Sequence, residues 1–374
     1  MTTLTDLYES QGQSPWLDNM RRDWLEDGTM AGLVAKGIRG VTSNPTIFAK
    51  AISGQDTYDQ EFGKLIKTQS VEGAYWDLVV DDIEAALAIL RPVYDSSDGG
   101  DGYVSVEVAP SLAHDTDGTI AAARSLHQRI NRPNVLVKIP ATPECVPSIR
   151  QMISEGRSIN VTLIFSIARY DQVIEAYLSG LEALAGSGRN DLSHVASVAS
   201  FFVSRVDTEV DRRLENAARS SDQAEKLHAL CGKAAVAQAR LAYRLFTERF
   251  SGDRWEALAA LGARVQRPLW ASTSTKNPAY PDLAYVDTLI GPHTVNTMPD
   301  ATVADFLDHG TVARTVDTDF EEADHVIDQL AAAGIAMEDV AQVLEAEGVA
   351  SFAKSFDELV QSLSDKAAVL TART

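Results

Sequence analysis

The segment VLVKIPAT, residues 135–142, carries most of the information about the fold. Its apolar residues are mainly of the kinds that favour strands. They lie on both faces of the expected strand, as in a parallel sheet that helices cover. Lys138 interrupts this run. If the strand is central, the lysine points into a barrel or at a helix layer, and neither place suits a solvated ammonium. Otherwise the segment is an edge strand whose lysine reaches solvent.

Similar short apolar segments recur along the chain. They are Trp16–Asp18, Gly37–Val41, Tyr103–Val108, Val135–Ile139, Ile159–Phe165, Val195–Val203, Pro268–Ser272 and His293–Asn296. Helical patterns separate them; one follows Asp115, and another has Ser166 as a suitable N-cap and Gly186 as a suitable helix end. Alternating strands and helices predict a mainly parallel sheet. Eight strands favour a closed (β/α)₈ TIM barrel over an open sheet, and no GxGxxG motif supports a dinucleotide-binding fold.

We expect residues 1–374 to form a single (β/α)₈ barrel domain, because such barrels take about 250 residues or more as one unit. Insertions are expected around residues 50–102 and 207–264. A helical C-terminal segment is expected from about residue 320, with a break at Gly334. The acidic stretch DSSDGGDG, residues 95–102, is predicted to be a flexible insertion or exposed turn.

Charge and cysteine content argue against several classes of protein. The 33 Lys and Arg against 53 Asp and Glu give a net charge of −20. This leaves no basic footprint for nucleic acid and disfavours anionic membranes. No apolar run reaches the length of about 18 residues that a spanning helix needs, and Met1–Gln11 lack a signal-peptide pattern. Cys145 and Cys231 form no CxxC motif, which fits a reducing cytoplasm, so we expect a cytoplasmic protein.

Three charged residues in or beside predicted strands are candidates for catalysis, because the carboxyl-terminal strand ends form the site of such barrels. A lysine amine attacks a carbonyl only in its neutral form, which burial favours, so Lys138 is a candidate for imine chemistry. Glu107, in YVSVEVAP, is either a general acid–base acting on water or a solvent-facing residue on an alternating strand. Asp18 is either a base or the N-cap of a helix at residues 19–24.

Further polar residues are candidates for substrate binding. Asn160 and Thr162 lie in the otherwise apolar SINVTLIF, where buried amides and hydroxyls need partners that a polyhydroxylated substrate would supply. Asn44 lies in GVTSNPT, and Asn-Pro is first of all a turn signal. No histidine or cysteine cluster has the spacing of metal ligands, so we expect no metal.

Two strand ends together are candidates for a phosphate clamp. Ser200 and Arg205 flank an apolar triplet that includes Phe202, and WASTSTK, residues 270–276, is a hydroxyl-rich strand end with a terminal cation, Lys276. Two cations and several hydroxyls suit a phosphate group. The alternative is a surface salt bridge of Arg205 with Asp207 or Glu209 and an ordinary turn at residues 273–277.

Taken in order, these segments resemble the transaldolase family, and in particular its longer bacterial subgroup. The segments are GVTSNPTIF, VSVEVAPSL, VLVKIPAT, INVTLIFS, ASFFVSRVD, LWASTSTKNP and TVNTMPDAT, and they span nearly the whole chain. The resemblance implies a (β/α)₈ barrel without a cofactor. It also implies transfer of a dihydroxyacetone unit from sedoheptulose 7-phosphate to glyceraldehyde 3-phosphate, giving erythrose 4-phosphate and fructose 6-phosphate in the pentose phosphate pathway.

The resemblance further implies a catalytic group. Lys138 corresponds to the family's Schiff-base lysine on the fourth strand, and Glu107 corresponds to its catalytic glutamate. Asp18 corresponds to the base on the first strand. Thr162, the fifth-strand threonine, belongs with them.

The remaining candidates correspond to substrate-binding residues. Asn44 matches the asparagine of the TSNP or TTNP motif, and Asn160 matches the fifth-strand asparagine. Ser200 and Arg205 match the phosphate-binding pair on the sixth strand, and Phe202 is assigned to the same site.

The seventh strand departs from the family pattern. Many members have a phosphate-binding arginine there, whereas this chain has Ser272, Ser274 and Lys276. Which of the three takes its place is left open, because a lysine does not reproduce the bidentate fork of an arginine.

Two other functions are weighed beside transaldolase. A fructose-6-phosphate aldolase would use the same lysine chemistry and release free dihydroxyacetone. A non-catalytic barrel would bind sugar phosphates without turnover. The sequence leaves the protein as a monomer or homodimer.

Overall fold

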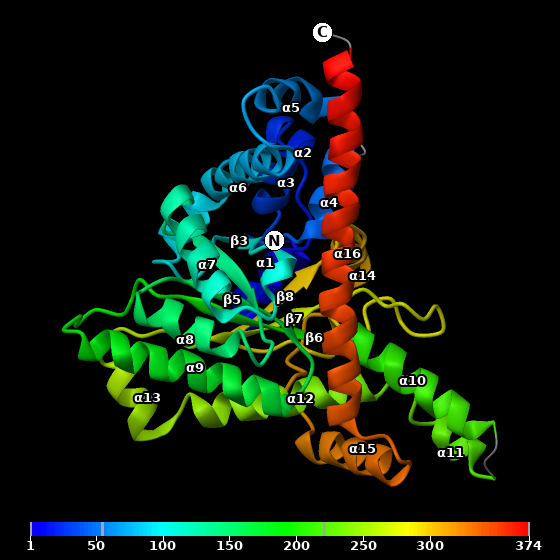
Figure 1. The fold of residues 1–374 in the computed structure, drawn as a ribbon. Coiled ribbons are helices and arrows are strands. Elements are labelled where there is room, and N and C mark those ends of the chain that lie inside the picture. Colours follow the sequence, from blue (N-terminus) through cyan, green and yellow to red (C-terminus); the bar gives the residue numbers. More distant parts are fainter. Residues whose placement is uncertain (1, 54–55, 220–221, 373–374) are drawn as a thin grey trace.

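The computed structural model describes residues 2–53, 56–219 and 222–372, and within these ranges eight parallel strands close into a barrel (Figure 1). The strands are β1 Gln13–Leu17, β2 Gly40–Val41, β3 Tyr103–Glu107, β4 Val135–Pro140, β5 Ile159–Ile164, β6 Ser197–Phe202, β7 Arg267–Ala271 and β8 Thr294–Met298. Each strand pairs with its neighbours in sequence, and β8 closes on β1. The predicted (β/α)₈ fold is confirmed.

The strand boundaries differ most at β1. The sequence predicts Trp16–Asp18, whereas the strand begins at Gln13 and ends before Asp18. Polar residues at its start obscured the apolar pattern. Gln13 is nevertheless buried, and its side-chain amide is satisfied there by donating to Leu289 O at 2.7 Å. Asp18 therefore lies just beyond the carboxyl-terminal end of its strand.

Helices surround the barrel. They are α1 Thr3–Gln11, α2 Arg22–Glu26, α3 Thr29–Ala35, α4 Pro45–Ser53, α5 Asp59–Leu65, α6 Val71–Ser96, α7 Thr116–Ile130, α8 Val146–Ser154, α9 Ile167–Gly186, α10 Ser204–Ala218, α11 Ala224–His228, α12 Ala234–Arg249, α13 Gly252–Ala259, α14 Asp300–His309, α15 Phe320–Ala332 and α16 Met337–Ala372, with short 3₁₀ turns at Asp56–Tyr58 and Pro110–Leu112. Ser166 accepts a hydrogen bond from Arg169 N and caps α9 as predicted, and Asp115 accepts one from Gly118 N and caps α7.

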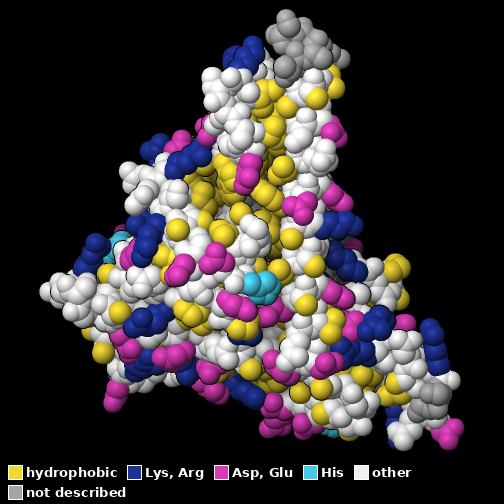
Figure 2. Space-filling model, viewed as in Figure 1, with side chains coloured by type: hydrophobic (Ala, Val, Ile, Leu, Met, Phe, Trp, Pro, Cys, Tyr) yellow, Lys and Arg dark blue, Asp and Glu magenta, His cyan; other side chains and the backbone are white. Residues whose placement is uncertain are grey.

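The long C-terminal helix α16 crosses the barrel and packs against α4, α6, α10 and β5 (Figure 1). Gly334, with φ of 81°, lies between α15 and α16, as its predicted break requires. Figure 2 shows apolar side chains gathered along the upper part of α16, on the side of α4 and α5. The helix therefore belongs to the packed body of the protein.

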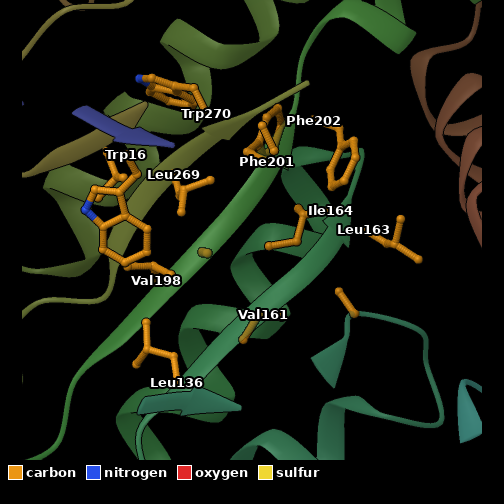
Figure 3. Packing of buried hydrophobic residues seen from close by; sticks show 14 of the residues in the cluster. Trp16, Leu136, Val161, Leu163, Ile164, Val198, Phe201, Phe202, Leu269 and Trp270 are labelled. Atoms are coloured by element: carbon orange, nitrogen blue, oxygen red, sulfur yellow. The ribbon is translucent and has the colours of Figure 1, made fainter. Parts of the chain in front are cut away.

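Apolar side chains from several strands pack together inside the barrel, toward the amino-terminal ends of the strands (Figure 3). Trp16, Leu136, Val198 and Leu269 come from β1, β4, β6 and β7 and are fully or almost fully buried. Gly40 of β2 makes room for the Trp16 ring, because a Cβ there would lie 2.3 Å from a ring carbon. A cavity of about 540 Å³ adjoins Leu136 and Val198 on the side of the amino-terminal strand ends, whereas the site of such barrels lies at the carboxyl-terminal ends.

The acidic stretch 95–102 was predicted to be a flexible insertion or exposed turn, and the structure differs. Its first two residues end α6, and Asp101 is completely buried beneath the barrel. The Asp101 carboxylate accepts hydrogen bonds from Trp16 Nε1 at 2.8 Å, from Arg39 Nε at 2.9 Å and from Ser14 Oγ. The side chain is therefore part of the barrel floor, which composition alone did not reveal.

Candidate active site

Lys138 and Glu107 form a buried ion pair at the carboxyl-terminal ends of β4 and β3. The two residues are register partners on the neighbouring strands. Lys138 Nζ lies 3.4 Å from Glu107 Oε2, and each side chain is 6% exposed. The same amine donates to Ser43 O at 3.4 Å. Since β4 pairs with both β3 and β5, the alternative of an edge strand with a solvated lysine is wrong.

Glu107 faces the barrel interior, so the alternative of a solvent-facing residue is also wrong. Burial raises the pKa of the Glu107 carboxyl above its ordinary value, and the nearby Lys138 charge opposes this. Among the described residues, Glu107 Oε2 makes no hydrogen bond. Glu107 borders a cavity of about 10 Å³ that Ser43 and Asn44 also line. A cavity of this size is close to the minimum for one water.

Asp18 follows β1 and turns toward the same interior. Its Oδ1 accepts a 2.7 Å hydrogen bond from Thr42 Oγ1. Burial raises the pKa of Asp18, whereas Lys138 and the Thr42 hydrogen bond lower it. The alternative role as a helix N-cap is wrong, because α2 begins at Arg22 and Arg21 occupies the N-cap position.

Asn160 lies beside Lys138 in the register of β4 and β5. Its Nδ2 donates to Ser105 Oγ at 2.9 Å, and its Oδ1 accepts from Ser200 Oγ at 2.8 Å. This chain of hydrogen bonds joins β3, β5 and β6 just below the amine. Ser200 is therefore held deep in the barrel, with its hydroxyl already engaged.

Thr162 follows on β5, opposite Pro140. Its hydroxyl is buried and has no hydrogen-bond partner among the described residues. Leu163 after it has φ of 61°, where the register with β6 shifts. A buried hydroxyl without a partner is costly, which is characteristic of a site that binds something else.

Asn44 combines a structural role with a place in the site. Its Oδ1 accepts a hydrogen bond from Ile47 N at 3.0 Å, so the side chain caps the start of α4, as the Asn-Pro turn signal indicated. Asn44 also lines the space above Lys138.

The main cavity lies above Lys138 and has a volume of about 110 Å³. It is lined by Asp18, Thr42, Asn44, Lys138, Ser200, Phe202, Arg205, Ala271, Ser272, Ser274, Lys276, Thr297, Pro299 and Phe352. It adjoins an outer cleft of about 730 Å³, which shares Asp18, Asn44, Arg205 and Lys276 with it. The predicted candidates thus converge at one end of the barrel. Glu107, Asn160 and Thr162 are not among the residues that line this cavity.

Arg205 lies in the first turn of α10, with its guanidinium carbon 5.2 Å from the centre of the Phe202 ring. Burial lowers the pKa of Arg205. The predicted alternative of a surface salt bridge is wrong, because Arg205 makes no ion pair within the described part of the chain. Glu209 instead binds Arg212 and Arg213. A cation at a helix N-terminus suits an anionic ligand.

The segment after β7 carries the other predicted phosphate ligands. Ser272 Oγ lies 2.8 Å from Ser204 Oγ of α10, and Lys276 Nζ donates to Ser274 Oγ at 2.5 Å. The loop that continues from Lys276 is tied back to α10, where Tyr285 donates to Asp207 at 2.8 Å. Burial raises the pKa of Asp207 to about 6.

The sequence did not reveal several residues of this site, among them Thr42, Thr297 and Phe352. Phe352 projects from α16, is 6% exposed, and its ring centre lies 5.9 Å from Lys138 Nζ and 6.0 Å from the guanidinium carbon of Arg205. The sequence predicted a helical segment from about residue 320, but it did not predict which surface this segment covers.

Residues 2–53, 56–219 and 222–372 contain neither a metal-binding cluster nor a membrane-spanning helix. No group of three or more His, Cys, Asp or Glu side chains there is arranged to hold a metal ion. No helix among them combines the length and apolar character needed to cross a membrane.

A closed parallel barrel with a buried amine–carboxylate pair beneath a polar cavity defines a (β/α)₈ barrel enzyme with its site at the carboxyl-terminal strand ends. The sequence model of the family described as Transaldolase/Fructose-6-phosphate aldolase matches residues 15–363. The chain is 49% identical to a transaldolase of Acidothermus cellulolyticus over 94% of both chains. It is 49% identical to one of Thermobifida fusca over 96% of this chain and 97% of the other. It is 48% identical to a transaldolase of Saccharopolyspora erythraea over 98% of this chain and 99% of the other. The chain belongs to the transaldolase family, as predicted, and is a transferase of that family.

Proposed function

We propose that this protein moves a dihydroxyacetone unit from sedoheptulose 7-phosphate to glyceraldehyde 3-phosphate through a Schiff base on Lys138. The observation that carries the proposal is the Lys138 amine, buried at the active end of the barrel and 3.4 Å from the Glu107 carboxylate. A buried amine beside a group that moves protons is what imine formation with a ketone requires.

Imine formation is the first half of the reaction. Neutral Lys138 attacks the C2 ketone of the donor. Glu107 acts through a water, for which the adjoining cavity has room, and helps expel water from the carbinolamine. The buried Thr162 hydroxyl, which has no hydrogen-bond partner among the described residues, is assigned to the same proton transfer. The product is a protonated imine, which accepts electrons from the neighbouring carbon–carbon bond.

Cleavage and transfer follow. Asp18 removes the proton of the C4 hydroxyl, the C3–C4 bond breaks, and its electron pair moves into the imine. The aldose phosphate leaves, and a three-carbon enamine stays on Lys138. The acceptor aldehyde then binds, and the steps run in reverse.

The binding residues divide by chemistry. Asn44 and Asn160 are assigned to the hydroxyl groups near the imine, which orients the enamine. Arg205, Lys276 and the hydroxyls of Ser272 and Ser274 are assigned to the phosphate. The N-terminus of α10 adds to their positive potential. No step of this mechanism calls for a cofactor.

Borohydride trapping tests the proposal. The protein is incubated with fructose 6-phosphate and borohydride, digested, and analysed by peptide mass. We expect a reduced three-carbon adduct on Lys138 and none in Lys138→Ala, which should also lose transfer activity. An adduct on another lysine, or no adduct with the folded protein, rejects the mechanism.

The family description also covers fructose-6-phosphate aldolases. Stoichiometric free dihydroxyacetone from fructose 6-phosphate would identify that activity, and binding without turnover would identify a non-catalytic barrel. The relatives named above are transaldolases, and this favours transfer. Action in the cytoplasm, as a monomer or homodimer, is part of the same proposal.

A further inference from the structure

Phe352 separates two spaces at the barrel mouth. It lines both the inner cavity of about 110 Å³ above Lys138 and the outer cleft of about 730 Å³. Its ring is almost completely buried between the Lys138 amine and the Arg205 guanidinium. The side chain comes from α16, a helix outside the eight strands and their connections (Figure 1).

Contacts on both sides of Phe352 fix its helix to the barrel. One turn before it, a Cβ at Gly348 would lie 3.0 Å from Leu163 Cδ2 and 3.6 Å from Arg205 Nη1, so the helix backbone closely approaches β5 and α10. One turn after it, Ser355 Oγ accepts a 2.9 Å hydrogen bond from Thr46 Oγ1 of α4. The ring is therefore part of the site's architecture and not a chance contact.

The sizes of the two spaces suit different parts of the reactants. The inner cavity, of about 110 Å³, is the smaller of the two, and the outer cleft, of about 730 Å³, is the larger. The smaller space lies directly against Lys138, where the three-carbon fragment would be bound. Arg205 and Lys276 line both spaces, so the rest of the donor extends from the inner cavity along Phe352 toward the outer cleft.

We propose that Phe352 is a specificity-determining residue that covers the three-carbon intermediate on Lys138 and keeps water from releasing it. This inference rests on the Schiff-base function proposed above. While the aldose phosphates exchange in the outer cleft, the apolar ring remains over the inner cavity. The enamine then meets an acceptor aldehyde before it meets bulk water.

The unwanted reaction that Phe352 suppresses is hydrolysis. A proton adds to the nucleophilic carbon of the enamine and restores the protonated imine. The oxygen of a water then bonds to C2, a proton moves to the nitrogen, and the carbon–nitrogen bond breaks. Free dihydroxyacetone and the Lys138 amine result. Each event consumes one water and uses no oxidant or reductant.

The partition between transfer and release tests the proposal. Wild type, Phe352→Leu and Phe352→Ala are given fructose 6-phosphate with and without erythrose 4-phosphate, and sedoheptulose 7-phosphate and free dihydroxyacetone are measured. We expect release relative to transfer to increase in the order wild type, Leu, Ala. The increase for Ala should be roughly tenfold, which corresponds to a loss of about 1.4 kcal/mol in the barrier to hydrolysis.

Leu359→Ala is the matched control. Leu359 is buried two turns further along α16 and is not among the residues that line either space. This variant should loosen the helix, as thermal unfolding will show, and leave the partition unchanged. If Leu359→Ala shifts the partition equally, or if neither Phe352 variant shifts it, the proposed role of Phe352 is rejected. Borohydride trapping on Lys138 of the wild type is measured in a separate experiment. It shows whether the Schiff base forms, independently of whether Phe352 protects the intermediate from water.

Discussion

The Thr42 hydroxyl links Asp18, which follows β1, to Thr297 of β8. It donates a 2.7 Å hydrogen bond to Asp18 Oδ1 and lies 2.7 Å from Thr297 Oγ1. Since a hydroxyl has one proton to donate, Thr297 is the donor in the second bond. Residues from β8 and from the loops after β1 and β2 thus orient one carboxylate.

The first prediction concerns pH. Burial raises the pKa of Asp18 and the Thr42 hydrogen bond lowers it. A base works in its ionised form, so kcat/KM should fall on acidification as Asp18 gains a proton. Thr42→Val removes a bond to the ionised form, so this fall should begin at higher pH. We expect a shift of about one unit, because a hydrogen bond to a charged group contributes roughly 1.5 kcal/mol or more.

The pH profile of kcat/KM for wild type and Thr42→Val measures this shift. Thr247→Val, at an exposed position on α12, should leave the profile unchanged. A shift of the acid limb toward lower pH in Thr42→Val would contradict the role of Asp18 as base.

The second prediction separates proton transfer from binding. Glu107→Gln keeps the shape of the side chain but removes its ability to exchange a proton. We expect kcat to fall by about 10²–10⁴, the usual contribution of general acid–base catalysis, with a smaller change in KM. Single-turnover borohydride trapping should slow by a similar factor while the adduct stays on Lys138. A normal trapping rate would show that Glu107 takes no part in imine formation.

The third prediction concerns the phosphate. Arg205→Ala should lower kcat/KM for glyceraldehyde 3-phosphate by about 10–100-fold, because a bond between charged groups contributes roughly 1.5–3 kcal/mol. Unphosphorylated glyceraldehyde should show little change. Arg212→Ala, which removes an arginine that is 59% exposed and paired with Glu209, is the control. Equal losses for both acceptors would assign Arg205 a structural role.

The sequence predicted the parts of the site that lie in strands. Lys138, Glu107 and Asn160 interrupt apolar segments, which marks them as candidates, but local pattern left open whether Lys138 and Glu107 face the interior or solvent. Their closeness then follows from parallel register, which brings the corresponding ends of adjacent strands together.

The local sequence pattern could not predict contacts between segments that are far apart in the chain. Phe352 is one apolar residue of a long helix, and only the packed structure shows that this helix crosses the barrel mouth. Asp101 lies in an acidic, glycine-rich stretch typical of exposed turns. Its burial depends on partners that are more than 60 residues away in the chain. Such partners have no signature in the sequence around either residue.

The last prediction concerns this barrel floor. Asp101 is the shared acceptor for Ser14, Trp16 and Arg39, and Arg267 Nη2 lies 3.5 Å away. In Asp101→Asn one oxygen becomes an NH₂ group that faces donors, and two partly buried guanidinium groups lose their counter-charge. Breaking a buried pair costs about 3–5 kcal/mol. We therefore expect a clearly lower urea midpoint, followed by tryptophan fluorescence, since Trp16 is one of the donors.

Asp98→Asn is the control for this experiment, because Asp98 lies three residues earlier in the same stretch and is exposed. Its φ of 51° suits asparagine as well as aspartate. This variant should unfold at the wild-type midpoint. The folded fraction of Asp101→Asn should keep its kcat, because the floor and Lys138 lie at opposite ends of the packed layer around Trp16. A wild-type midpoint for Asp101→Asn would mean that the floor contributes nothing to stability.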